Sequence, residues 1–95
     1  MDEQLLHGHN DYVLCVALRS NGHVASGSRN GSIIVHSTSS NNVEYRADNV
    51  TKTFANGVYG LCYLRNGSLV ACGYNMFGGA NLKVFSPSLE LVQTL

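Results

Sequence analysis

The chain has 95 residues with six basic and six acidic side chains, so its formal net charge is zero. A neutral surface lacks the charge that attracts phosphate backbones and anionic membranes, which argues against nucleic acid and membrane as partners. No apolar run approaches the roughly 20 residues that span a bilayer, and Met1-Asp2-Glu3 lacks a basic signal-peptide start, so we expect a location in the cytosol or nucleus.

The first half of the chain predicts three antiparallel strands. Asn-Gly pairs, which tolerate the positive φ of hairpin turns, separate segments at 12–18, 23–28 and 32–37. The first segment is apolar at every position, which predicts an interior strand buried on both faces. The polar run from Ser37 to Asn42 predicts a surface loop after the third strand.

The same order of segments returns in the second half. Leu14-Cys15 recurs as Leu61-Cys62, Leu18-Arg19-Ser20-Asn21-Gly22 as Leu64-Arg65-Asn66-Gly67, Val24-Ala25-Ser26-Gly27 as Val70-Ala71-Cys72-Gly73, and Ile34-Val35-His36-Ser37 as Lys83-Val84-Phe85-Ser86. The offset drifts between 45 and 49 residues, and we attribute its later growth to an insertion near residues 75–79. A period in the forties with about four strands per unit is typical of β-propeller blades.

Several of these motifs resemble those of the WD-repeat family. Leu5-Leu6-His7-Gly8-His9 resembles its Gly-His element, and Ala25-Ser26-Gly27-Ser28-Arg29-Asn30-Gly31-Ser32 resembles its Ala-Ser-Gly-Ser-x-Asp-Gly-Thr turn. Neither unit ends a strand in Trp-Asp, and the chain has no tryptophan. The resemblance implies an all-β fold of two consecutive four-stranded antiparallel blades, a partial propeller. Blade 1 would cover about residues 1–42 and blade 2 about 43–88, with 89–95 as the outer strand of a following or swapped blade.

The resemblance also implies a hydrogen-bonded staple in each blade, made by a histidine, a serine or threonine, a turn aspartate and the tryptophan. In the first blade these positions hold His9, Ser26, Asn30 and His36. In the second they hold Asn56, Cys72 and Phe85, and the insertion interrupts the turn. We expect a partial staple in the first blade and none in the second.

By the same resemblance, the chain is expected to be a non-catalytic scaffold for protein partners, without a cofactor. Propeller partners commonly dock on the rim formed by the loops that enter the inner strands. The rim candidates are Asn10, Asp11, Tyr12, Arg29, Asn56, Val58 and Tyr59. Met76 and Phe77, in the inserted loop, are either further interface anchors or side chains folded back over the blade edge.

Other readings of the same residues stay open at this point. A small independent β-barrel or sandwich with a ligand pocket is one, and a metal enzyme that uses His7 and His9 with His23 or His36 is another. Ser26 with His9 could form a nucleophile pair, but inside a blade we expect that contact to be structural. A truncated or decayed reading frame without activity is a further alternative.

The three cysteines, Cys15, Cys62 and Cys72, are odd in number and widely spaced, and we interpret them as reduced core residues. Two blades would share one interface and leave two apolar faces uncovered, each at a cost comparable to the stability of a small domain. We therefore expect the chain not to be a compact monomer. It would be a piece of a longer propeller, a self-associating unit, or a unit covered by another chain.

Overall fold

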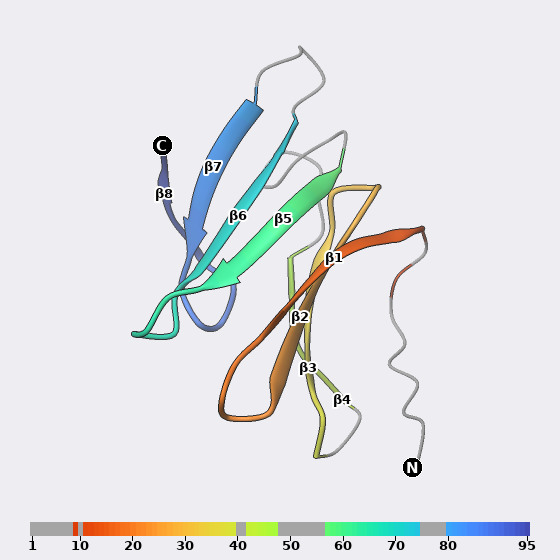
Figure 1. The fold of residues 1–95 in the computed structure, drawn as a ribbon, viewed down its shortest axis with the longest axis vertical. Helices are drawn as coiled ribbons and strands as arrows, with labels where there is room; N and C mark the ends of the chain where they lie inside the picture. Colours follow the sequence, from red (N-terminus) through yellow and green to blue (C-terminus); the bar gives the residue numbers. More distant parts are fainter. Residues whose placement is uncertain (1–8, 10, 40–41, 48–56, 75–79) are drawn as a thin grey trace.

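The computed structural model describes residues 9, 11–39, 42–47, 57–74 and 80–95, which form eight strands and, within these ranges, no helix (Figure 1). The first sheet contains β1 (Val13–Leu18), β2 (His23–Ser28), β3 (Ile33–Ser37) and β4 (Asn42–Ala47). The second contains β5 (Val58–Tyr63), β6 (Leu69–Tyr74), β7 (Ala80–Phe85) and β8 (Leu91–Thr94). Both sheets are antiparallel and follow the chain order. The expected all-β fold of two four-stranded antiparallel sheets is confirmed.

Glycines at positive φ make the tight turns between neighbouring strands. Gly22, Gly31 and Gly67 have φ values of 89°, 89° and 91°, which only glycine adopts without steric cost. The asparagine before the glycine also orders the turn: Asn21 Oδ1 accepts a hydrogen bond of 3.0 Å from the backbone N–H of His23. Each of these Asn-Gly pairs therefore reverses the chain and fixes the register of its hairpin.

The strand pairing differs from the expected division of the chain into blades. Residues 42–47 form β4, which pairs with β3, so the first sheet extends beyond residue 42. Residues 91–94 form β8, which pairs with β7 as the fourth strand of the second sheet rather than joining another blade. In both sheets the fourth strand runs antiparallel beside the third. The two strands therefore satisfy each other's backbone N–H and C=O groups.

The prediction that the first strand is interior and buried on both faces is wrong. β1 lies at the edge of its sheet, next to β2 alone. Its two faces differ, because Cys15 and Ala17 pack against the core while Val16 and Leu18 are 60% and 75% exposed. The apolar sequence of this strand therefore leaves one hydrophobic face uncovered.

The register of the two sheets also corrects the alignment of the repeats. Val16 pairs with Ser26 in the first hairpin, and Leu61 pairs with Ala71 in the second. The hairpins therefore coincide at a constant offset of 45 residues, the separation of their Asn-Gly turns, so Ala71 and not Cys72 is the counterpart of Ser26. A shift of one residue moves a side chain to the other face of a sheet, so the difference matters for packing.

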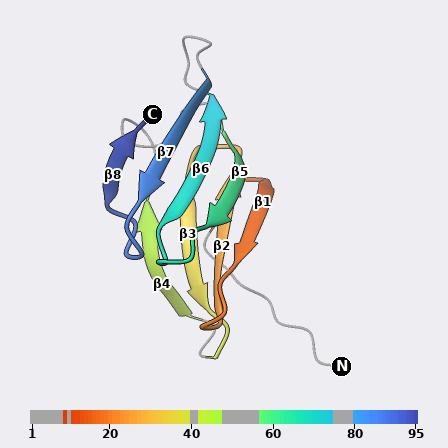
Figure 2. The same cartoon turned by 60° about the vertical axis from the view of Figure 1, so that its left-hand side comes forward.

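The core lies between the two sheets, which pack face to face as two layers (Figure 2). β5 contacts both β1 and β2. The fully buried cluster draws on both sheets: Ala25, Ile33, Val35, Val58, Leu69, Ala71, Phe85 and Leu89. The two sheets approach each other closely at Gly27, where an added Cβ would lie 2.5 Å from Cγ1 of Val58. The Cys15 thiol bridges the same gap, donating a hydrogen bond of 3.4 Å to the carbonyl oxygen of Val58.

Candidate protein-interaction rim

The fold brings the beginning of β1, the turn between β2 and β3, and the beginning of β5 to the same end of the molecule (Figure 1). We call the side chains of Asp11, Tyr12, Arg29 and Tyr59 at this end the aromatic rim. Tyr12 is 68% exposed and Tyr59 50% exposed. Two sheets thus contribute aromatic side chains to one stretch of accessible surface.

Arg29 is held in place by contacts with Asp11 and Tyr12. Its guanidinium forms an ion pair of 3.0 Å with Oδ1 of Asp11, and its Nε donates to Oδ2 at 3.3 Å. The guanidinium carbon also lies 4.6 Å from the centre of the Tyr12 ring, within range of a cation–π interaction. The backbone N–H of Arg29 donates to the carbonyl oxygen of Tyr12 at 2.9 Å. An exposed ion pair adds little stability, but these contacts together orient the arginine.

Gly57 connects this group to the second sheet. Its φ is +119°, and a Cβ added there would lie 3.2 Å from the Tyr59 ring and 3.3 Å from the carbonyl oxygen of Arg29. A side chain at this φ would be strained and would also press on both neighbours, so glycine suits the position. Gly57 was not among the predicted rim residues, although the Asn56-Gly57 pair signals a turn at this place in the sequence.

The charge of the rim is set locally. The pKa of Asp11 lies below its ordinary value, chiefly because its carboxylate accepts a hydrogen bond from the backbone N–H of Tyr12 and secondarily because Arg29 is close. Asp11 therefore stays ionised at neutral pH and balances the arginine. The rim offers aromatic surface and a fixed guanidinium with no large excess of either charge.

The rim residues predicted from the sequence have three different outcomes. Asp11, Tyr12 and Arg29 are brought together, and Tyr59 lies beside them through Gly57. The prediction that Val58 lies on the surface is wrong, because its side chain is fully buried in the core between the sheets. The remaining candidates, Asn10, Asn56, Met76 and Phe77, lie outside the described residues.

The expected hydrogen bond between His9 and Ser26 is present, with 2.7 Å between Nε2 and Oγ. Asn30 instead bonds within its own turn, where its Oδ1 accepts from the Ser28 hydroxyl and from the Ser32 backbone N–H. His36 is buried on β3. In the second sheet the counterpart of Ser26 is Ala71, which has no hydroxyl to form such a bond.

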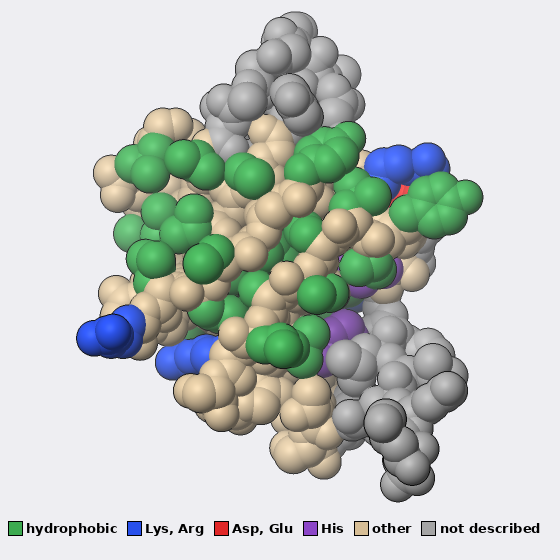
Figure 3. Space-filling model, in the orientation of Figure 1, with side chains coloured by type: hydrophobic (Ala, Val, Ile, Leu, Met, Phe, Trp, Pro, Cys, Tyr) green, Lys and Arg blue, Asp and Glu red, His purple; other side chains and the backbone are tan. Residues whose placement is uncertain are grey.

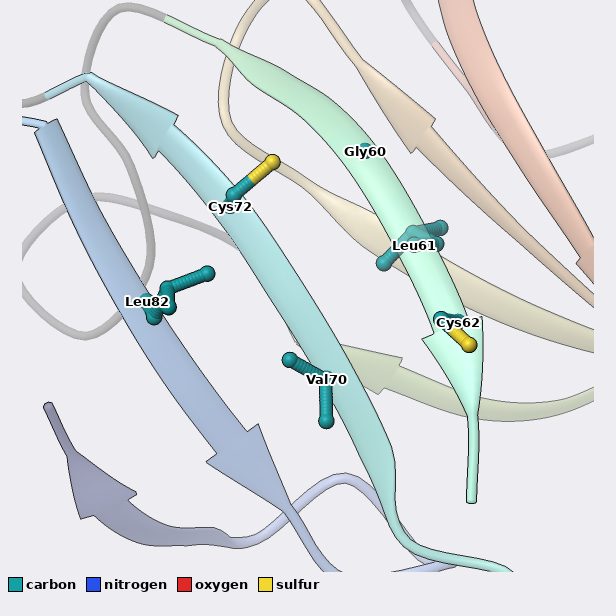
Figure 4. A pocket seen from close by; sticks show the side chains of 6 residues that line it. All are labelled: Gly60, Leu61, Cys62, Val70, Cys72 and Leu82. Carbon is teal, nitrogen blue, oxygen red and sulfur yellow. The ribbon is translucent and has the colours of Figure 1, made fainter.

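A shallow hollow of about 290 Å³ lies on the face of the second sheet that points away from the first (Figure 4). Its lining comes from β5, β6 and β7 and consists of Gly60, Leu61, Cys62, Val70, Cys72 and Leu82.

The interpretation of all three cysteines as core residues is wrong for Cys62, which is exposed, while the other two are partly buried. Burial raises the pKa of the Cys15 thiol, so its reactive thiolate is disfavoured at neutral pH.

Within the described part of the chain, no three His, Cys, Asp or Glu side chains lie close enough together to hold a metal ion. His23 packs edge-on against Tyr45, with ring centres 6.4 Å apart, and its Nδ1 lies 3.4 Å from Nδ2 of Asn21. Ser26 is nearly fully buried, which leaves its hydroxyl little access to a substrate. A search of the same residues for a helix that could cross a membrane found none.

Two four-stranded antiparallel sheets, stacked through their first strands, define the architecture of consecutive β-propeller blades. Residues 2–37 match the family model described as "WD domain, G-beta repeat". That match covers 36 of the 95 residues and shows that this segment is similar to a WD repeat.

The chain is also similar to other known proteins. The chain is 36% identical over 62 residues to Echinoderm microtubule-associated protein-like 1 of human, mouse and rat. The match covers 65% of this chain and 7% of each relative, so the chain spans only a small part of their length. The crystal structure of the computationally designed Ika4 protein has a TM-score of 0.62 and 16% identity, over 100% of this chain and 80% of that one. At that identity the likeness shows the fold alone.

Proposed function

We propose that the chain is a protein-binding unit of the WD-repeat type and that its partner docks on the aromatic rim. WD repeats typically mediate protein interactions and are generally non-catalytic. The observation that carries the proposal is the arrangement around Arg29, whose guanidinium is held by Asp11 and lies 4.6 Å from the Tyr12 ring centre. Location in the cytosol or nucleus stays a prediction, supported by three cysteines that are free thiols.

The chemistry of the rim supports a protein as the partner. Tyrosine and arginine are over-represented among the residues that contribute most to protein binding, since they offer large contact area together with hydrogen bonding. An arginine already oriented in the free protein loses little conformational freedom on binding. The rim combines these features in Tyr12, Arg29 and Tyr59, whereas the hollow of the second sheet is apolar.

The name of the relatives, microtubule-associated protein-like, suggests polymerised tubulin as the first partner to test. The experiment is co-sedimentation of the purified chain with microtubules, comparing wild type with Tyr12→Ala and Tyr59→Ala. We expect each rim variant to bind about tenfold more weakly, since truncating an interface anchor costs more than about 1 kcal/mol. Because both tyrosines are exposed, neither change should unfold the chain, which circular dichroism verifies.

Val92→Ala is the matched control, because this side chain is 64% exposed on β8 in the outer part of the second sheet. It should bind as wild type does. If the wild-type chain does not pellet with microtubules, tubulin is excluded and the rim is tested with ligands selected from a displayed-peptide library. Wild-type binding by both rim variants would overturn the rim, and failure to select any peptide would overturn the protein-binding function.

A further inference from the structure

Two apolar surfaces remain uncovered on opposite sides of the stacked sheets. The first, here the β1 face, consists of Val16 and Leu18 on the side of β1 that points away from the second sheet. The second, here the β5–β7 face, consists of Gly60, Cys62, Val70, Cys72 and Leu82, which line the hollow in Figure 4. Figure 3 shows hydrophobic side chains spread across the side of the molecule where β7, β6, β5 and β1 lie.

The β5–β7 face repeats the surface by which the first sheet packs on the second. That packing surface of the first sheet includes Cys15, Ala17, Ala25, Gly27 and Ile33, and it continues on β3 and β4 with Val35, Tyr45 and Ala47. In the register of the hairpins, the counterparts of the first five residues are Gly60, Cys62, Val70, Cys72 and Leu82. The uncovered face of the second sheet is therefore the same kind of surface as one that is already seen packed.

The β1 face repeats the β5 part of the other half of the same contact. Leu61 and Tyr63 of β5 pack against the core between the sheets, and their counterparts on β1 are Val16 and Leu18. Within the chain β5 contacts β1 and β2, so the first strand of one sheet packs on the first two strands of the other. β1 is thus the equivalent of β5, and the β5–β7 face is the equivalent of the face on which β5 packs.

Charge does not oppose burial of either surface. The strands β1 and β5 contain no Asp, Glu, Lys, Arg or His, and the five residues of the β5–β7 face include only apolar side chains, glycine and thiols. Bringing the two faces together would leave no charged group of these strands buried without a partner. It would also remove from water two exposed apolar faces of the kind that mark interaction surfaces.

We propose that a second copy of this chain docks its β1 face on the β5–β7 face of the first, repeating between molecules the contact between the two sheets. The two surfaces differ, so the contact is heterologous and each copy keeps one free face until a ring closes. Propellers typically have four to eight blades, which corresponds to two to four copies of a two-bladed chain. The proposal does not depend on the aromatic rim, which it leaves accessible.

The test is the solution mass of the chain, measured by light scattering or sedimentation equilibrium over a range of concentrations. Wild type should have two to four times the monomer mass of 10.2 kDa. Val16→Asp and Leu82→Asp each place a charge on one of the two faces, so each should remain at the monomer mass. Val92→Asp is the control on β8 and should assemble as wild type does.

Mixing the two monomeric variants tests the heterologous geometry. Val16→Asp retains an intact β5–β7 face and Leu82→Asp retains an intact β1 face, so an equimolar mixture should form a species of twice the monomer mass and nothing larger. Cys62→Asp, at an exposed site on the same face, replaces Leu82→Asp if circular dichroism shows that Leu82→Asp does not fold.

Three results would overturn the proposal. A wild-type mass of 10.2 kDa at all concentrations would exclude self-association. Assembly of Leu82→Asp and Cys62→Asp at wild-type mass would show that the β5–β7 face takes no part in the contact between copies. A mixture of folded variants that remains monomeric would exclude the pairing of these two faces.

Discussion

Gly27→Ala is the most direct test of how the two sheets pack. A Cβ at residue 27 would lie 2.5 Å from Cγ1 of Val58, 2.8 Å from its Cβ and 2.9 Å from the Cys15 sulfur. All three distances are shorter than van der Waals contact, and two of them involve a β-branched side chain that is fixed in the core. The methyl group must therefore push β2 and β5 apart.

The expected cost is about 2 kcal/mol, within the range measured when a methyl is forced into a packed core. Intrinsic backbone preference acts in the opposite direction, since glycine inside a strand is worse than alanine by roughly 0.5–1 kcal/mol. A net loss of stability must therefore come from the steric clash and not from backbone preference. A Val58→Ala background removes the closest of these contacts, the one with Cγ1, and keeps those with the Cβ of residue 58 and the Cys15 sulfur. The same substitution should therefore cost less there than in wild type, a coupling typical of residues in contact.

The assay is urea or thermal unfolding of the four proteins of this double-mutant cycle, at one protein concentration because self-association would make the midpoint depend on it. A loss of about 2 kcal/mol corresponds to a fall in Tm of roughly 10 °C for a chain of this size. If Gly27→Ala unfolds at or above the wild-type midpoint, the close packing of β2 on β5 is refuted. Equal costs in the two backgrounds would refute the role of Val58.

Two further predictions concern the polar contacts. Ser26→Ala removes the hydroxyl that forms the 2.7 Å hydrogen bond with His9 and should lower the free energy of unfolding by about 1 kcal/mol in denaturant titrations, whereas an unchanged midpoint would show that the bond contributes nothing. The pKa of the Asp11 carboxyl, followed by NMR, should lie below 3.8 and should rise only part of the way in Arg29→Ala, because the Tyr12 N–H remains as the larger cause. Since the folded-state pKa is depressed, the contribution of Asp11 to stability is present above the unfolded pKa and is lost as pH falls through the folded one. Complete return to 3.8 in Arg29→Ala would contradict that order of causes.

Part of the rim could be foreseen from the sequence, and part could not. Tyr12 and Tyr59 follow from the position of aromatic residues where the inner strands begin, and Arg29 follows from the adjacent turn. Val58 and Tyr59 are consecutive in one strand, so their side chains point to opposite faces and only one of them could be exposed. Which one is exposed depends on the face that meets the first sheet, and that face is determined by residues such as Gly27 that are distant in the chain.

By itself, the sequence determined where the strands and turns lie. β2 covers the residues expected for it, and β1 and β3 differ by one residue at a single end, because Asn-Gly turns and strand propensity act over a few neighbouring residues. The tertiary structure alone decided that β1 is an edge strand with an exposed face, that residues 42–47 complete the first sheet, and that Ala71 rather than Cys72 matches Ser26. These properties depend on which strand lies beside which and on hydrogen-bond register, where a shift of one residue exchanges buried and exposed faces.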